Sequence, residues 1–426
     1  MDVTEKSSPA CSAGPRRPRV KLTRRVLSVV RKVSVLDWIR IGLLVAGVLC
    51  VLTGLLPASQ AEGNLRRIAP LLLFLASVIV LAKLARQAQV FDVIAVRLAI
   101  VGRGNYLALF AFCVAFASLT TMFLNLDTTA VLLTPVMLAL APKARIAALP
   151  LAMTTLWLAN TASLLLPVSN LTNLLAADRV ALTAPAFAAR LWLPQLAAIV
   201  VTMVFLWICY WRRGQRGVDR YLPPPPLRLE TPRQRMLFAV TGAACLLFIV
   251  AIPFLREQIG YAAAVAAMIG VAAFAVLDRR ALRLELIPWQ LLVFVTGLFL
   301  VVPTLSQYGL SDIMTALIGT DQNGAGMYRA ATAGAGLSNV LNNLPAYTAG
   351  EAVIPAGNRD QLLALLIGTN IGPIVTPWAS LATLLCLESC RDHKLRVPLV
   401  KFMLTGLGLA VVVLGSSIGA LLLTSS

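Results

Sequence analysis

Long apolar runs recur along this chain and constrain its fold more than any other feature. A helix needs about 20 consecutive apolar residues to cross a bilayer, and at least eight stretches approach that length: residues 41–56, 68–82, 106–124, 186–210, 236–255, 261–277, 286–305 and 402–423. Of the 426 residues, 59% are hydrophobic and only 13% are charged, so a water-soluble fold could not cover this apolar surface. We therefore predict an integral membrane protein.

The membrane spans are expected to be helices. A lone strand would leave unpaired backbone groups in hydrocarbon, and the alternating pattern of barrel strands is missing from these runs. The predicted fold class is all-α membrane, a polytopic helical bundle.

The formal net charge of +19 is concentrated in the connections between the apolar runs. This placement argues against nucleic acid as a partner and marks the cytoplasmic side of an inner membrane. We predict that residues 1–36 form a basic cytoplasmic tail on anionic lipid, and that 212–235 form a Pro/Arg-rich cytoplasmic linker. A targeting peptide is the alternative for the tail, but the first apolar run lacks a small-residue cleavage site and another span follows it at once.

The linker separates residues 37–211 from residues 236–426, and an internal repeat relates these halves. At a constant offset of 210 residues, Asn160 matches Asn370, Pro167 matches Pro377, and Asp178 falls on Glu388. Membrane carriers commonly contain such repeats in inverted orientation, with the substrate where their broken helices meet. We therefore expect two inverted repeats with broken or re-entrant helices.

Four clusters of Asn, Ser and Thr with Pro interrupt the apolar runs, near 125–135, 160–173, 338–345 and 369–383. Pro removes a backbone donor, and the unwound segment offers carbonyls, amides and hydroxyls to a polar passenger. The alternative is that the polar groups join helices and the prolines only kink them. The predicted substrate-binding residues are Asn125, Asn160, Ser169, Asn170, Asn339, Asn342, Asn343, Thr369 and Asn370, with helix breaks at Pro135, Pro167, Pro345 and Pro377.

The first and third clusters are expected to be equivalent, although their residues do not fix the register between them. Asp127 is the predicted proton-coupling residue, because a carboxylate in an apolar region can bind and release a proton as access alternates. Alternatively, it caps a helix expected over 128–140.

Enzyme signatures are missing from the chain. No GxxxxGK[ST] phosphate loop, HExxH zinc pair, GxSxG elbow or DDxxD motif occurs, and the seven cysteines show no CxxC or disulfide-framework spacing. Cys386 and Cys390 share a helix face and could offer soft ligands to As(III), but we expect them to pack, because no third thiol is near in the sequence. We expect no enzymatic activity, cofactor or metal, so energisation by ATP would need a separate ATPase subunit.

At these clusters the sequence resembles the arsenical-pump membrane protein (ArsB) family of the ion-transporter superfamily. The resemblance depends on the segments 125–135, 160–174, 338–346 and 368–384, in that order and spacing. It implies a secondary-active permease that exports arsenite or antimonite by proton antiport or with an ATPase partner. The alternatives are a sodium/proton antiporter or sodium-coupled anion symporter of the same superfamily and, from another class, a membrane scaffold or receptor without transport.

Overall fold

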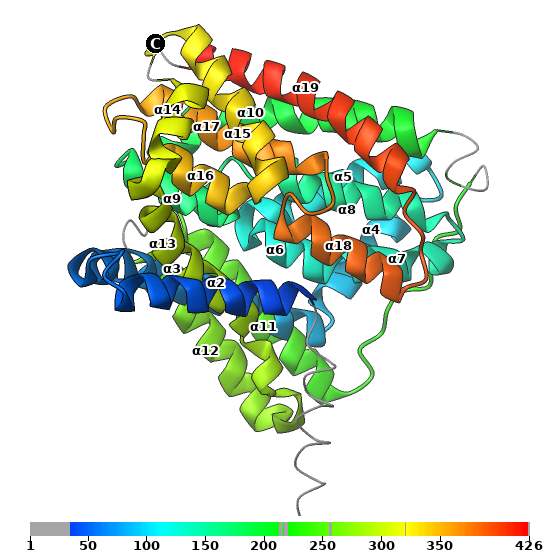
Figure 1. Cartoon of the computed structure of the whole chain (residues 1–426). Coiled ribbons are helices and arrows are strands. Elements are labelled where there is room, and N and C mark those ends of the chain that lie inside the picture. The colour runs from blue at the N-terminus through cyan, green and yellow to red at the C-terminus, as the bar shows by residue number, and fades with distance from the viewer. Residues whose placement is uncertain (1–34, 213–215, 217–219, 255–257, 320, 425–426) are drawn as a thin grey trace, which may run out of the picture.

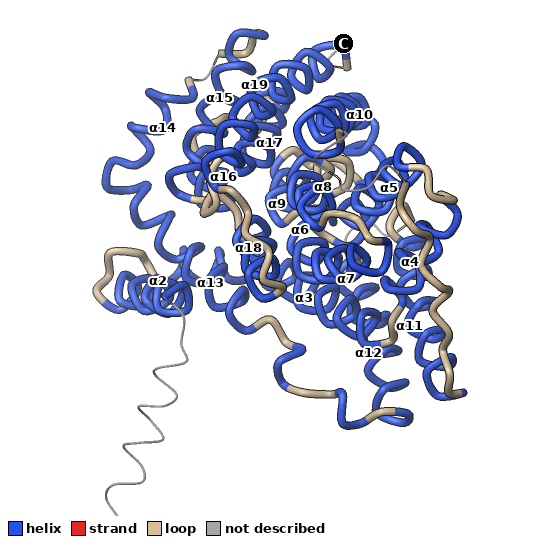
Figure 2. The backbone as a smooth tube through the Cα atoms, turned by 90° about the vertical axis from the view of Figure 1, so that its right-hand side faces the viewer, coloured by secondary structure: helices blue, strands red, loops and turns tan. Residues whose placement is uncertain are grey.

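The computed structural model describes residues 35–212, 216, 220–254, 258–319 and 321–424. Those residues form helices and loops, with no strand among them (Figures 1 and 2). The basic tail predicted over residues 1–36 lies almost entirely outside the described part of the chain.

Eight helical segments are long and apolar enough to cross a membrane. They are α3 (Ala58–Gln87), α5 (Tyr106–Leu124), the run Leu126–Ala144, α10 with η3 (Ala184–Trp211), α11 (Pro232–Ala251), α12 (Ile259–Leu277), the run Trp289–Ile318 and α19 (Leu399–Leu423). The shorter apolar helix α2 covers Val35–Leu52. The predicted all-helical, polytopic membrane fold is confirmed.

The sequence reading missed one of these spans, the run Leu126–Ala144. It comprises α6 (Leu126–Thr128), the π-helical turn η1 (Thr129–Leu133) and α7 (Thr134–Ala144). Its mean hydropathy is 1.2, whereas the other seven reach 1.8 or more, because threonines lie within it. Thr129 donates to the carbonyl of Asn125 at 3.0 Å, and the Thr134 hydroxyl bonds to Sγ of Cys386 at 3.0 Å, so the span tolerates these two residues. The buried hydroxyl of Thr128 has no hydrogen-bond partner among the described residues.

The two halves of the chain interlock through one group of helices. In Figure 1, α2 lies across α13 (Trp289–Leu305), while α11 and α12 extend below them. Helix α2 packs along α13, and α3 packs along α12. Gly297 lets α13 approach α2 closely, because any side chain at this position would meet the backbone of Leu43 and Leu44. Helices from both halves therefore build this framework.

A second group of helices holds the interruptions. Helix α10 packs along α19 at the upper edge of Figure 1, and α15 (Gly324–Leu341) packs along α17 (Arg359–Ile371). A Cβ atom at Gly368 or Gly372 would collide with the backbone of Ala331 or Ala335 in α15. Glycines at these two positions therefore let α17 approach α15 closely.

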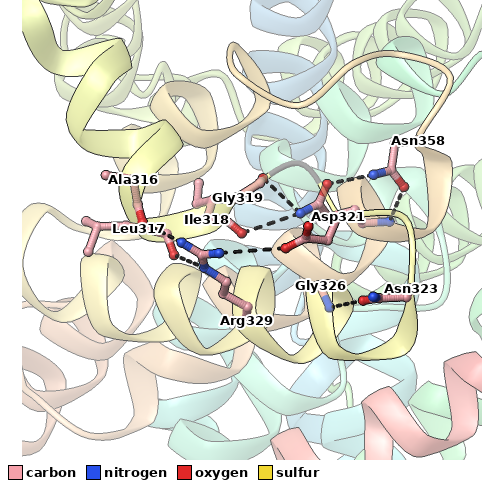
Figure 3. A network of polar contacts seen from close by, with 10 residues as sticks. Ala316, Leu317, Ile318, Gly319, Asp321, Asn323, Gly326, Arg329 and Asn358 are labelled. Carbon is pink, nitrogen blue, oxygen red and sulfur yellow. Dashed lines mark hydrogen bonds and ion pairs between the residues drawn. The ribbon is translucent and has the colours of Figure 1, made fainter.

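The connection from α14 (Ser311–Ile318) to α15 is fixed by side chains (Figure 3). Arg329 donates to the carbonyls of Ala316 and Leu317, at 2.6 and 3.0 Å, in the last turn of α14. Asn323 caps α15 by accepting from the amide of Gly326 at 2.8 Å. These bonds satisfy helix-end groups that would otherwise lack partners.

Candidate functional site

Two interrupted helices lie at the same position in the two repeats. Helix α8 (Ala148–Thr161) gives way to a loop with a short 3-10 turn, Pro167–Ser169, before α9 (Leu171–Arg179). Helix α17 is followed by the 3-10 turn Gly372–Ile374 and a loop before α18 (Leu381–Asp392). The predicted broken helices are present in both halves.

The second half-helix of each repeat begins with a side-chain cap. Asn170 accepts from the amide of Thr172 at 3.3 Å to cap α9. Ser380 accepts from the amide of Thr383 at 3.1 Å to cap α18. Asn170 and Ser380 are 210 residues apart, the same offset that relates the two sequences.

These caps also join the repeats to each other through Asn370. Its Oδ1 accepts from Nδ2 of Asn170 at 2.9 Å and from the hydroxyl of Thr172 at 2.7 Å, and its Nδ2 donates to Oδ1 of Asn173 at 2.7 Å. All four residues are buried. Satisfied polar networks of this kind fix one arrangement of the elements that carry them.

The matching residue of the other repeat, Asn160, makes the matching contacts. Its Oδ1 accepts from the hydroxyl of Ser380 at 3.0 Å, and its Nδ2 donates to Oγ1 of Thr383 at 3.2 Å. Since Ser380 and Thr383 are 210 residues beyond Asn170 and Asn173, two of the three contacts recur with the repeats exchanged. The bond from Thr172 does not recur, because Ala382 is at the matching position. A two-fold axis produces such reciprocal pairing, so the contacts indicate pseudo-two-fold symmetry between the repeats. We refer to these residues, Asn160, Asn170, Thr172, Asn173, Asn370, Ser380 and Thr383, as the carboxamide network.

A second pair of breaks lies at Asn125, after α5, and at Asn342, after α15. Both residues have φ of 86°, with ψ of 150° and 156°, a region that side chains strongly disfavour. Their amides donate to Thr121 and Ser338, one turn back. The structure thus fixes the register between the two regions, Asn125 with Asn342, that the residues alone left open.

Asn125, rather than Asp127, caps the helix that follows the first break, because its Oδ1 accepts from the amide of Asp127 at 2.9 Å. Its Nδ2 is buried and has no hydrogen-bond partner among the described residues. Ser169 donates to the carbonyl of Met122 at 2.8 Å, so the two breaks of the first repeat are in direct contact.

The second break of the other repeat packs on the loop before α18. Asn339 donates to the carbonyl of Gly372 at 2.9 Å and accepts from the hydroxyl of Thr376 at 2.7 Å. The amides of Asn342 (side chain) and Asn343 (main chain) donate to the carbonyls of Trp378 and Ala379, at 3.2 and 2.9 Å. Asn339, Asn342 and Asn343 therefore connect the two breaks of the second repeat. None of these four hydrogen bonds reaches a residue of the carboxamide network.

The remaining predicted residues take other positions. Thr369 donates within its own helix, to Leu366 at 3.0 Å. Pro167 begins a 3-10 turn and Pro377 lies in the loop before α18, so both lie inside interruptions. Pro135 and Pro345 lie in the first turn of α7 and of α16 (Asn343–Glu351), after the chain has already been broken at Asn125 or Asn342.

Gln195 was missed by the sequence reading. It lies in α10, is 2% exposed, and accepts from the amides of Leu164 and Leu165, at 2.7 and 3.1 Å, just after α8 ends. Its Nε2 donates to the carbonyl of Thr161 at 2.9 Å. A single carboxamide within an apolar span was the available signal, because such a residue needs polar partners in the bilayer.

Asp127 faces a cavity of about 960 Å³ that both repeats line. Asp127 and Thr128 come from the first repeat, and Pro377 and Leu381 come from the second. Four basic side chains also line the cavity: Arg40, Lys83, Arg391 and Arg396. Glu388 lines the cavity as well, so the cavity offers two carboxylates among cations beside the repeat interface.

A group of charges joins α3 to the ends of α9 and α16. Arg67 contacts Asp178 at 2.9 Å and Glu351 at 3.6 Å. The Glu351 side chain is 6% exposed, and its second carboxylate oxygen has no partner among the described residues. Asp178 is 58% exposed and lies at the outer edge of this group.

An all-helical membrane bundle with two broken, symmetry-related segments and a polar interface at their meeting point defines a multi-pass membrane transporter. Residues 33–360 match the family model described as citrate transporter. The chain belongs to this family.

Curated relatives carry arsenical-pump names. The arsenical pump membrane protein of Escherichia coli strain K12 is 28% identical over 371 residues, covering 82% of this chain and 85% of that protein. The protein of the same name from Yersinia enterocolitica is 29% identical with the same coverage. These similarities confirm the predicted resemblance and place the chain in a multi-pass inner-membrane protein group.

The crystal structure of the YdaH transporter of Alcanivorax borkumensis has the same fold. The TM-score is 0.53 with 14% identity, covering 86% of this chain and 89% of that one.

Proposed function

We propose that this protein is a secondary-active permease that exports arsenite or antimonite, by proton antiport or with a separate ATPase subunit. The arsenical-pump names of its relatives support this substrate class. In this proposal the passenger site is formed by the predicted polar residues around the carboxamide network, and Asp127 carries the coupled proton. The amino terminus and the linker face the cytoplasm.

The observation that carries the proposal is the uncharged chemistry of the carboxamide network. Every side-chain hydrogen bond between the two repeats there joins a carboxamide or hydroxyl to another. Arsenite near neutral pH is an uncharged trihydroxide, which such groups can bind as donors and acceptors in turn. A passenger entering this interface would replace bonds between the repeats with bonds to itself, and the repeats could then separate.

A second candidate is an anion symporter, which the cavity beside Asp127 favours. Arg40, Lys83, Arg391 and Arg396 surround it, and the family description names citrate. A tricarboxylate would need such cations, whereas an uncharged passenger would not.

Purified protein in proteoliposomes distinguishes these candidates by counterflow. Vesicles preloaded with arsenite, citrate or sodium are diluted into the labelled form of the same solute. The proposal expects accumulation of labelled As(III) without sodium dependence. Citrate exchange that requires sodium, with no As(III) exchange, would replace the proposal with the symporter, and no exchange of any solute would favour a non-transporting scaffold.

Cells without their own arsenite exporter provide the second test. Expression should lower cellular As(III) and raise resistance. Asn323→Ala, which alters a helix cap and no bond of the carboxamide network, serves as an expression-matched control that should also confer resistance. Unchanged As(III) content at normal membrane abundance would remove the substrate assignment.

A further inference from the structure

A cavity of about 840 Å³ lies where the linker leaves the membrane helices, apart from the breaks and the Asp127 cavity. It is formed by the turn between α4 (Val90–Val101) and α5, by the end of η3 (Trp207–Trp211) and by the linker. Its lining residues are Arg103, Gly104, Asn105, Tyr106, Leu107, Trp207, Arg212, Arg216 and Arg220.

Four of these nine residues are arginines, and none of the nine is acidic. No hydrogen bond or ion pair links the guanidinium groups of Arg103, Arg212, Arg216 or Arg220 to another described residue. Four like charges converging on one cavity repel one another unless an anion is bound between them.

Arg216 is the most informative of the four, because it is only 9% exposed. Its guanidinium lies over the ring of Tyr106, 4.2 Å from the centroid, and 5.9 Å from that of Trp207. The Arg216 carbonyl accepts from the amide of Ala147 at 3.1 Å, which holds its backbone in place. Aromatic faces orient the guanidinium but do not neutralise it, and none of the described residues supplies a counter-charge to it.

The start of α5 adds to the positive potential of the cavity. The 19-residue helix α5 begins at Tyr106, with its cap residue Asn105 in the lining. Gly104, with φ of 82°, turns the chain into this cap. Helix amino termini favour anions through their free amides and dipole, and guanidinium groups bind the oxygens of phosphate in pairs.

Apolar side chains lead away from the cavity along the helices. Leu107 is 60% exposed, and Val204 and Ile208, on the helical segment that ends at Trp211, are 50% and 43% exposed. In a bilayer these surfaces face acyl chains, and Trp207 and Tyr106 suit the interface. A ligand with a phosphate head and apolar tails fits this combination better than free phosphate.

We propose that this cavity binds a phosphate-bearing anion, namely the phosphodiester headgroup of an anionic phospholipid, between Arg103, Arg212, Arg216 and Arg220. Its acyl chains lie along Leu107, Val204 and Ile208. The bound lipid ties the linker between the two halves to the membrane surface.

The test measures binding of lipid to full-length, delipidated protein in neutral detergent, by native mass spectrometry and by the shift in melting temperature. The probes are cardiolipin, phosphatidylglycerol, phosphatidylcholine and inorganic phosphate. The variants are Arg216→Gln and the double variant Arg212→Gln with Arg220→Gln, whose side chains are exposed, so folding is retained. The control changes Arg279, Arg280 and Arg283, exposed arginines of another loop, to Gln.

Wild-type protein and the control should bind cardiolipin and phosphatidylglycerol equally, while both cavity variants bind them about tenfold more weakly. Phosphatidylcholine should bind alike to all of them. Equal affinity of the cavity variants and the control for anionic lipid would overturn the proposal. If inorganic phosphate raises the melting temperature of wild-type protein at the same concentration as lipid, and the cavity variants lose this effect, the ligand is free phosphate. The assignment to a phospholipid would then be overturned.

Discussion

Asn125 and Asn342, one in each repeat, adopt the same disfavoured backbone conformation, with φ of 86° in both. Each follows the last residue of a helix, and each amide donates to the carbonyl four residues back. Such conformations cost about 1–3 kcal/mol for a residue with a side chain and persist where the surrounding structure enforces them. Their recurrence at matching breaks indicates that both repeats need this sharp exit from a helix.

The strain at Asn342 can be measured by comparing two substitutions. Asn342→Gly removes the steric conflict and should leave the melting temperature equal or higher. Asn342→Ala keeps a Cβ atom in the disfavoured region and should lower stability by about 1 kcal/mol relative to the glycine variant. Thermal unfolding of both variants in the same detergent makes the comparison. Equal stabilities would show that the conformation carries no strain.

Gln195 should be important for stability because it satisfies three backbone groups at the end of α8. Gln195→Leu leaves one buried amide, one half-buried amide and one carbonyl without this partner, and the expected cost is about 2 kcal/mol. The control is Gln307→Ala, an exposed residue that bonds only the side chain of Gln60 at 2.7 Å. If the two variants have the same melting temperature, the role assigned to Gln195 is wrong.

The ion pairs of Arg67 should also be measurable. Arg67→Met leaves the buried Glu351 carboxylate without its cation, which should cost about 2 kcal/mol, and adding Glu351→Gln should recover part of this loss. The exposed pair of Arg66 with Glu62, one residue away, provides the control. Arg66→Met should change stability by less than about 0.5 kcal/mol. A double variant no more stable than Arg67→Met would contradict this account.

Asp127 should be needed for coupling and not for folding. Its side chain faces the cavity that both repeats line, so Asp127→Asn keeps the shape of the site and removes the ionisable group. In proteoliposomes with an imposed pH gradient, net As(III) flux should fall to the protein-free level, while exchange without a gradient continues. Asp312→Asn, an exposed acid in the first turn of α14, should retain gradient-driven flux. Gradient-driven flux in Asp127→Asn would eliminate this residue from coupling.

Most membrane-spanning helices could be predicted from the sequence, because a helix needs about 20 consecutive apolar residues to cross a bilayer. The breaks near residues 160–170 and 370–380 were also predictable, since Asn and Pro recur there at one offset. The sequence predicts a helix over 128–140 but not the membrane span Leu126–Ala144, because its threonines lower the mean hydropathy.

The contacts between the repeats could not be read from the sequence. The offset identifies Asn160 and Asn370 as equivalent, but only the fold shows that each bonds the capping residue of the other repeat. Gln195 is another example, because its function depends on α10 lying beside the end of α8, a tertiary packing that no local pattern encodes.

The most direct test of the carboxamide network is As(III) counterflow in Asn370→Ala. This substitution removes three hydrogen bonds between the repeats, and Asn160→Ala removes two. Both variants should fold, reach the membrane and exchange As(III) no faster than protein-free vesicles, while Asn323→Ala exchanges it at the wild-type rate. Wild-type exchange by folded Asn370→Ala would contradict the claim that the passenger binds where the two repeats meet.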